Sequence, residues 1–363
     1  MHAWPKALIG ILGLQIWIVN SRRLVSKVLR NCIHCYDYKP HLLDQIMGSL
    51  PADRLSLTKP FAVTGVDLCG PFLTSYRIRG KAPYKTYMAV FVCFATKAVH
   101  VELVSDLSTN TFILCLKRFI GRRSLPNRIF CDNATNFFGT RTQLEEFKMQ
   151  LFSQQALKDL QMFTSSNGVE FSFIPPRAPH FGGLWEAAVK SMKLLLVKNT
   201  GHSHLTYEEL QTVAVDAEAV VNSRPLAPLS EDPNDGEALT PSHFLVGTSL
   251  KALPEPSLEE CNLSHLTRWQ RVTHIKQQFW ELWRRDYLHT LHARSKWLSP
   301  KANIVPGQVV MIHEDNASPQ QWPLGRITNT CSGADERVRV VDIKTAKGVI
   351  RRPIPPASGK TLK

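Results

Sequence analysis

Residues 63–70 read Val-Thr-Gly-Val-Asp-Leu-Cys-Gly, an apolar run that carries one carboxylate, Asp67, near its end. The β-branched residues of the run predict a buried strand, which Gly70 and Pro71 are expected to end. A carboxylate in such a strand is costly to bury unless something compensates its charge. Asp67 therefore indicates either a cap on the Gly-Pro turn or part of a polar site.

The sequence after this run predicts a layered α/β domain. Further strands are expected at 86–94, 98–104, 128–131 and 169–174. Helices are expected at 108–120, 142–163, 183–198 and 207–222. Ser108 is placed to cap the first of these helices. Three strands followed by alternating helices and strands are typical of an α/β domain, here of roughly 180 residues.

A second acidic residue, Asp132, follows the short predicted strand that ends at Cys131. Asn133 and Asn136 come directly after it, and their amides suit a bond to phosphate or a role in holding the loop. A turn-forming Asp-Asn pair is the alternative interpretation.

A third acidic residue, Glu186, lies on the predicted helix 183–198, four residues before Lys190 and seven before Lys193. This spacing places the three side chains within about 60° on one side of the helix. The apolar side is expected to hold Leu184, Ala188, Met192 and Leu195. Taken alone, Glu186 fits an ordinary solvated face with a Glu–Lys pair.

Taken together, Asp67, Asp132 and Glu186 predict a metal site at one edge of a sheet. A ligand set made only of carboxylate oxygens suits Mg²⁺ or Mn²⁺ rather than zinc or copper. Two such ions, roughly 3.5–4 Å apart, can activate an attacking oxygen and stabilise a leaving oxygen at phosphorus. Lys190 and Lys193 would then clamp phosphate beside the metals.

At these residues the chain resembles the integrase core of LTR retrotransposons, and most closely the Pao/BEL type. The resemblance is carried by Gly65–Asp67, by Cys131–Phe137 and by Ile174–Glu186, and it extends over nearly the whole chain. The 53 residues between Asp132 and Glu186 exceed the retroviral spacing and match the Pao/BEL type.

The resemblance implies an RNase H-like core, a mixed five-stranded sheet with flanking helices, and Asp67, Asp132 and Glu186 as the catalytic and metal-binding triad. It also implies processing of a DNA 3′ end and transfer of that end into target DNA. His180, just before the helix of Glu186, is expected to touch DNA.

The N-terminal segment contains Cys32-Ile-His-Cys35, which has zinc-knuckle spacing but supplies only half of a site. The resemblance implies a His-His-Cys-Cys zinc site, with His2 in the segment that matches its second His. The first His would lie upstream of Met1, so we expect a partial Zn²⁺ site at His2, Cys32 and Cys35, with a pair of inert thiols as the alternative.

The C-terminal third is the most basic part of the chain. From Ser264 to Lys363 there are 17 Lys and Arg against 7 Asp and Glu, within a total net charge of +14. Aromatic and basic residues alternate on a predicted helix at 265–291, which indicates either a nucleic-acid-binding surface or, as we prefer, a core stripe with a solvated basic face. The short strands after Ile304 resemble an SH3-like β-barrel that would grip the DNA backbone.

These features predict a series of domains. They are a partial zinc-binding-like domain (1–46), a linker (47–60), the catalytic core (61–245), a linker with the Trp-rich helix (246–300), an SH3-like domain (301–354) and a tail (355–363).

The expected function is that of a metal-dependent integrase, a polynucleotidyl transferase that binds element-end and target DNA, works as a homo-multimer and acts in the nucleus. The alternatives are a transposon-derived DNA-binding protein without activity and a nuclease that only hydrolyses. The apolar run Ala7–Val19 is too short to span a bilayer, lacks a cleavage site for secretion and predicts one buried helix. Of the eight cysteines, Cys69, Cys93, Cys115 and Cys131 lie in or beside apolar runs and are expected to be small core residues.

Overall fold

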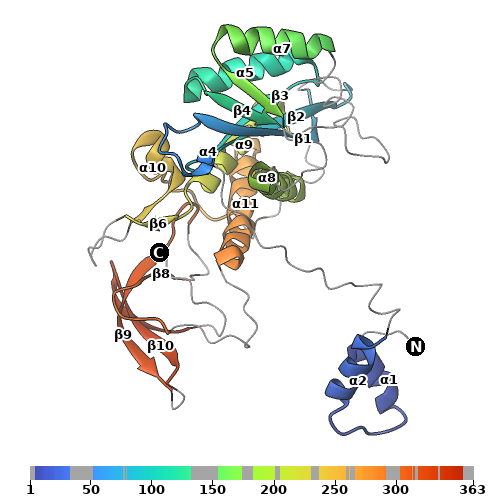
Figure 1. The fold of residues 1–363 in the computed structure, drawn as a ribbon, viewed down its shortest axis with the longest axis vertical. Coiled ribbons are helices and arrows are strands. Elements are labelled where there is room, and N and C mark those ends of the chain that lie inside the picture. The colour runs from blue at the N-terminus through green and yellow to red at the C-terminus, as the bar shows by residue number, and fades with distance from the viewer. Residues whose placement is uncertain are drawn as a thin grey trace. The chain divides into compact units, whose positions relative to one another are not determined.

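The computed structural model describes residues 5–32, 52–76, 78, 80–131, 154–173, 183–200, 205–229, 237–258, 261, 266–291, 303–312, 314, 318–333 and 336–354. It divides the chain into two compact units, Met1–Pro51 and Ala52–Lys363 (Figure 1).

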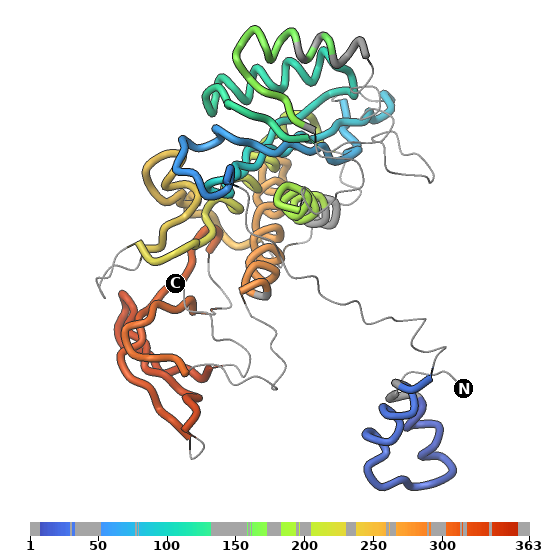
Figure 2. The backbone as a smooth tube through the Cα atoms, viewed as in Figure 1, coloured from blue at the N-terminus to red at the C-terminus, as the bar shows by residue number. Residues whose placement is uncertain are grey.

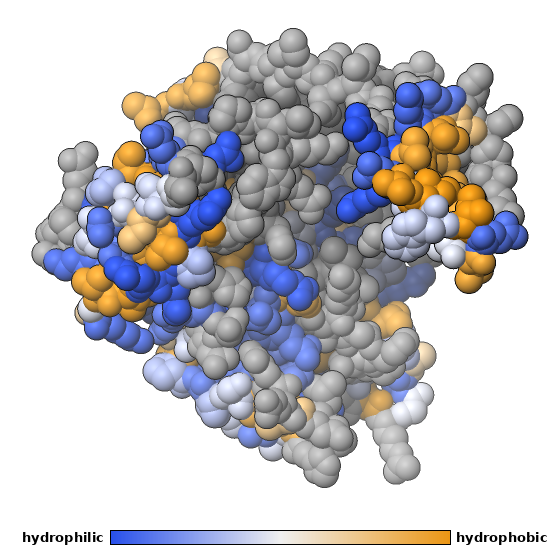
Figure 3. Space-filling model, turned by 90° about the horizontal axis from the view of Figure 1, so that it is seen from below, coloured by the Kyte–Doolittle hydropathy of each residue, from blue (hydrophilic) through white to orange (hydrophobic). Residues whose placement is uncertain are grey.

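The first unit contains two short helices, α1 (Pro5–Gly13) and α2 (Ser21–Arg30), which contact each other. The prediction of one buried helix over residues 7–19 is wrong, because α1 ends at Gly13. Trp17 follows in the connection and is 93% exposed. Apolar side chains are therefore interleaved with polar ones on the surface of this unit (Figure 3).

The second unit is built around a mixed five-stranded sheet with the strand order β3-β2-β1-β4-β5 (Figures 1 and 2). Its strands are β1 (Val63–Thr74), β2 (Tyr84–Cys93), β3 (Val99–Val104), β4 (Arg128–Cys131) and β5 (Glu170–Phe173). The first three pair antiparallel, whereas β4 and β5 join parallel to β1. This sheet with flanking helices confirms the predicted fold class at that level.

Strand β1 continues past the Gly70-Pro71 step, so the prediction that the strand ends there is wrong. The pairing with β2 shifts between Cys69 and Phe72 and then continues to Thr74. Gly70 has a φ of +140°, and a Cβ atom there would lie 2.9 Å from the ring of Tyr87. Glycine is thus required at position 70, where the irregular pairing allows Pro71 to lie within the strand.

Helices cover both faces of the sheet. Those on one face are α5 (Thr109–Arg123) and α7 (Gln154–Ser166), and those on the other are α8 (Gly183–Thr200), α9 (Tyr207–Asn222) and α11 (Arg268–Leu291). Ser108 accepts a hydrogen bond from the backbone N–H of Thr111 and caps α5, as expected. The predicted helix 142–163 lies partly outside the described residues.

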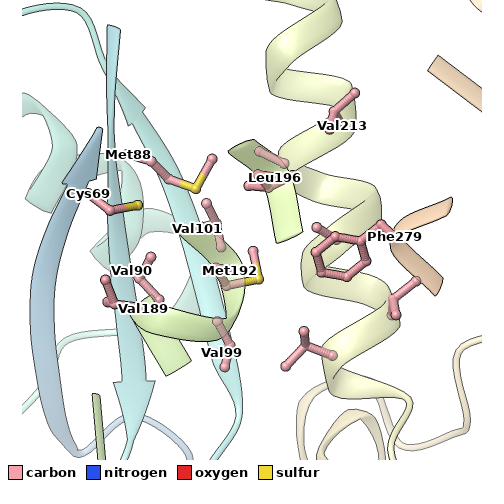
Figure 4. Packing of buried hydrophobic residues seen from close by; sticks show 14 of the residues in the cluster. Cys69, Met88, Val90, Val99, Val101, Val189, Met192, Leu196, Val213 and Phe279 are labelled. Atoms are coloured by element: carbon pink, nitrogen blue, oxygen red, sulfur yellow. The ribbon is translucent and has the colours of Figure 1, made fainter. Parts of the chain in front are cut away.

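Alternate residues of the central strands supply the two cores. Val90 and Val101 pack toward α8 and α9, together with Met192 and Phe279 (Figure 4). The intervening strand residues, such as Phe91, pack against α5. This period of two is what a sheet buried on both faces requires.

The cysteines of the sheet and α5 behave as small core residues, as predicted. Cys69, Cys93 and Cys115 are buried, and burial raises the pKa of the Cys115 thiol to about 12. No cysteine in the described part of the chain forms a disulfide. The Cys115 thiol therefore remains protonated at neutral pH and is a poor nucleophile.

The Trp-rich helix is a core element, which confirms the aromatic stripe of the preferred interpretation. The expected solvated basic face is wrong in part, because Lys276 and Arg284 of this helix are buried and ion-paired. Phe279, Trp280 and Trp283 are buried in the same cluster as α8 and α9. Trp269, in contrast, is 62% exposed at the start of α11.

A second, antiparallel sheet follows α11, with the order β11-β10-β9-β8. Its strands are β8 (Val309–Met311), β9 (Leu324–Ser332), β10 (Val338–Thr345) and β11 (Gly348–Pro353). Trp322, just before β9, packs edge-on against Trp280 at 4.9 Å and donates an indole N–H to Ser223 Oγ at 3.2 Å. The indole joins this sheet to the end of α9.

Shorter elements complete the second unit. They are α4 (Ala52–Leu55), β6 (Ala227–Pro228), β7 (Ala238–Leu239) and α10 (Pro241–Val246).

The outer edge of β3 is covered by side chains rather than by another strand. Asn222 of α9 accepts from the backbone N–H of Val99 and donates to its carbonyl, at 2.8 and 2.7 Å. Glu218, one turn earlier, accepts from the N–H of Val101 at 2.8 Å. These bonds satisfy backbone groups that would otherwise invite pairing with another chain.

Beneath this edge lies a buried ionic network around His100. Its imidazole contacts Glu102 at 3.0 Å and Glu218 at 3.4 Å, and Arg123 donates to both the ring and Glu218. Burial lowers the pKa of His100, but the hydrogen bonds to Glu102 and Glu218 outweigh it, so the pKa is raised above its ordinary value. His100, expected simply to pack on its strand, is thus also a member of a charged cluster.

The raised pKa of His100 gives folding a specific pH dependence. The folded state holds the imidazole proton more tightly than the unfolded state, so its stabilisation is fully present below the unfolded pKa of about 6.5. It is lost as pH rises through the higher folded pKa. We expect the free energy of unfolding in urea to decrease over that interval in the wild type, and His100→Gln to remove this component of the slope. An unchanged slope in His100→Gln would contradict the assignment.

Candidate active site

Asp67 lies on the face of the central strand that α8 covers. Its neighbours at alternate positions, Val63 and Cys69, belong to the core beneath α8, whereas Val66 and Leu68 belong to the core beneath α5. The carboxylate is half-buried and accepts a hydrogen bond from the backbone N–H of Leu68 at 2.8 Å. This bond holds one carboxylate oxygen near the backbone.

The first turn of α8 is fixed to the same strand by Trp185. A Cβ atom added to Gly65 would lie 2.2 Å from Cε3 of the indole, so the ring rests directly on the strand backbone. Trp185 is 1% exposed and stacks with Phe94 and Phe130, at centroid distances of 5.8 and 6.4 Å. The backbone of β1 and side chains from β4 and from the segment after β2 thus hold the start of the helix.

Glu186 follows Trp185 and is half-buried in the first turn of α8. Because Trp185 lies over Gly65, two residues before Asp67, the packing brings the start of α8 to the part of β1 that bears the first carboxylate. Lys190 and Lys193 are exposed further along the helix. Helical geometry places both on the same flank as Glu186.

The buried side of α8 differs from the expected one. It is formed by Trp185, Val189, Met192 and Leu196. Leu184 and Ala188 are only partly buried, and of the side chain of Leu195 nothing is described. The face is rotated from the prediction by about one residue, because the indole takes the position nearest the strand.

The third predicted carboxylate, Asp132, lies outside the described residues, as do Asn133, Asn136 and His180. The residue before it, Cys131, is the last of β4 and pairs in register with Val66, the residue before Asp67. Among the described residues, no group of three His, Cys, Asp or Glu side chains forms a metal-binding cluster. The triad is therefore described at two of its three positions.

Of the proposed zinc ligands, Cys32 is described and half-buried just after α2, where its backbone N–H donates to the carbonyl of Leu29 at 3.4 Å. His2 and Cys35 lie outside the described residues.

No role was predicted from the sequence for Trp185 or for its two stacking partners, Phe94 and Phe130. A signal was present, because Gly65 interrupts an otherwise β-branched strand, and a glycine within a strand often marks a close approach by another group.

Comparison with known proteins identifies two kinds of similarity. The family model described as "Family of unknown function (DUF5641)" matches residues 267–356, which span α11 and the second sheet. No curated protein sequence matches the chain.

Among solved structures, the chain is similar to the HTLV-2 integrase catalytic core domain in complex with magnesium, with 20% identity, a TM-score of 0.33, and coverage of 52% of this chain and 97% of that one. The chain is also similar to the catalytic core domain of BIV integrase, with 17% identity and a TM-score of 0.32. That match covers 52% of this chain and 95% of the BIV chain. A chain of the simian T-cell lymphotropic virus intasome in complex with the PP2A regulatory subunit B56 gamma matches with 16% identity and a TM-score of 0.30. That match covers 97% of this chain and 100% of that one. At these low values, the fold is defined by this chain's own strand order and pairing.

No helix in the described ranges has the length and apolarity needed to cross a membrane.

Packing of Trp185 on Gly65 predicts that Gly65→Ala forces the indole or the strand to move. Overpacking of this kind typically costs about 1–3 kcal/mol, so the free energy of unfolding in urea should fall by that order. Gly121→Ala is the matched control, because Gly121 lies in α5 with nothing within 4 Å of its added Cβ. The control should be neutral or slightly stabilising, since alanine favours helix. Equal effects of the two substitutions would contradict the packing role.

Proposed function

We propose that this chain is a DDE-type integrase, a polynucleotidyl transferase that processes and joins DNA ends with two Mg²⁺ or Mn²⁺ ions. The observation that carries the proposal is the packing of the first turn of α8, which bears Glu186, against the strand that bears Asp67. The sheet order and the register between β1 and β4 add support.

Asp132 completes the proposed site. Residues 128–131 run parallel to β1, and Phe130 stacks on Trp185 on the α8 side of the sheet. Side chains two residues apart in a strand share a face, so continued alternation would direct Asp132 to the side that carries Asp67. The three carboxylates would then supply oxygen ligands, which fit Mg²⁺ or Mn²⁺.

When bound, the two cations would supply charge stabilisation for the attacking and leaving oxygens at phosphorus. The chain's own residues position the substrate. Lys190 and Lys193 would bind the phosphates flanking the reacting one, and Asn133, Asn136 and His180 would contact the same DNA strand. The backbone bond from Leu68 restricts how far the Asp67 carboxylate can turn away.

The remaining parts of the proposal concern the whole protein. The second sheet, within residues 301–354, is proposed to be SH3-like and to bind the DNA backbone through its Lys and Arg excess. We further propose that the element is of the Pao/BEL type, that the chain works as a homo-multimer in the nucleus, and that His2, Cys32 and Cys35 form part of a zinc site.

A strand-transfer assay with labelled duplex DNA tests the central proposal. In Mn²⁺, wild type should yield joined products, and Asp67→Asn, Asp132→Asn and Glu186→Gln should each lose activity. Metal-ion stabilisation is worth several kcal/mol, so the expected loss is on the order of a hundredfold to a thousandfold. Glu170→Gln is the control, because Glu170 is an exposed carboxylate at the first residue of β5, the end of the strand opposite to the proposed site, where it pairs with Arg128.

The outcomes separate the alternatives. Cleaved but unjoined DNA would indicate a nuclease that only hydrolyses. DNA binding with no products from the wild type would indicate a DNA-binding protein without this activity. Equal rates in wild type and Asp132→Asn would refute the catalytic role of the three carboxylates.

A further inference from the structure

The ribbon formed by β1 and β2 extends beyond both neighbouring strands. Pairing with β4 stops at Val66, and pairing between β2 and β3 stops at Tyr87. Residues 72–74 and 84–86 remain paired only to each other within this sheet. Together with the connection between them they form an arm, residues 72–86.

The arm is held firmly at its base. The Thr74 hydroxyl donates to that of Thr86 at 2.7 Å, and both side chains are fully buried. The backbone N–H of Ser75 donates to the carbonyl of Leu205, between α8 and α9, at 2.8 Å. The arm is therefore fixed at its base beside Leu205, two residues before the start of α9.

The tip of the arm is strongly basic. Residues 76–85 include Arg77, Arg79, Lys81 and Lys85 and no acidic residue. The two described lysines, Lys81 and Lys85, are exposed. Lys81 Nζ lies 3.8 Å from the ring centroid of Tyr76, which in turn packs against Tyr84 at 4.5 Å.

An aromatic ring positions the ammonium of Lys81 without neutralising it. A carboxylate partner would cancel most of the field, whereas a ring leaves the full positive charge for a second ligand. No ion pair is found for Lys81 within the described part of the chain. Lys81 lies over the Tyr76 ring and Tyr84 packs against it, so both neighbours compete with a base for stacking on that ring. Phosphate is the ligand that this geometry favours.

We infer that the arm binds the phosphate backbone of duplex DNA at a distance from the reacting phosphate, an inference that rests on the proposed function. Asp67 and Thr74 are separated by seven residues of strand, or about 24 Å, which corresponds to about seven base pairs. Lys190 and Lys193 of α8 are exposed as well, and they add positive charge on the helix that bears Glu186.

The test is equilibrium binding of the full chain to a fluorescent DNA duplex of about 25 base pairs, in EDTA, over about 50–200 mM salt. Each phosphate contact contributes about 0.9 to the slope of log affinity against log salt. Lys81→Gln should reduce the slope by about that amount and weaken binding at each salt concentration, most strongly at the lowest. Lys81→Glu should weaken binding further, and Lys81→Arg should restore the wild-type slope.

Lys117→Gln is the matched control. Lys117 is also exposed and lies over an aromatic ring, Phe163, but it belongs to α5 on the opposite face of the sheet. The slope of log affinity against log salt for Lys117→Gln should equal that of the wild type. The arm proposal is overturned if Lys81→Gln and Lys117→Gln have the same slope, if Lys81→Arg fails to restore it, or if the wild type does not bind the duplex.

Binding in EDTA keeps this test separate from catalysis. A chain that shows the Lys81 effect but joins no DNA in Mn²⁺ supports the arm and refutes the integrase activity. If the wild type joins DNA but Lys81→Gln has the same salt-dependence slope as the wild type, the integrase activity is supported and the arm proposal is refuted.

Discussion

The contact between the Trp185 indole and the backbone of Gly65 is the constraint on which the candidate site depends. An indole can approach a strand this closely only where no Cβ intervenes. Among the described residues, the indole N–H is buried without a hydrogen-bond partner. Leaving such a donor unsatisfied costs about 1–3 kcal/mol, which the burial of the ring against Phe94 and Phe130 must offset. Apolar packing on the glycine backbone thus fixes the position of the indole.

Most of the sheet could be predicted because the period-two pattern is strong in strands buried on both faces. Strands β3 and β4 and helix α9 lie within a residue of the predicted bounds. The continuation of β1 could not be predicted, because Gly70-Pro71 is locally a turn signal and only the partner strand β2 keeps the chain extended through it. The break of α1 at Gly13 was missed for the converse reason, since an apolar run concealed a glycine that ends the helix.

The candidate site was visible in the sequence to the extent that burial makes charge expensive. Asp67 was predicted as a site residue because it is a carboxylate in an apolar strand. In the structure it lies on the face of the sheet that α8 covers. The orientation of α8 was less predictable, because Leu184, Trp185 and Ala188 are all apolar and the period of 3.6 alone does not choose among them. The network around His100 was not predictable at all, because its members are distant in the sequence. Arg123 lies 23 residues after His100, and Glu218 lies a further 95 residues along the chain.

The second sheet and α11 also bear on the site, although they lie far from Asp67 in the sequence. The matched family segment begins at residue 267, at the start of α11, yet the buried face of this helix belongs to the same core as α8 and α9. Phe279 and Trp280 could not be exposed without opening the layer that supports α8. Trp322 then ties the sheet to α11 and to Ser223 at the end of α9. The C-terminal third therefore supports the helix of Glu186 from its outer side.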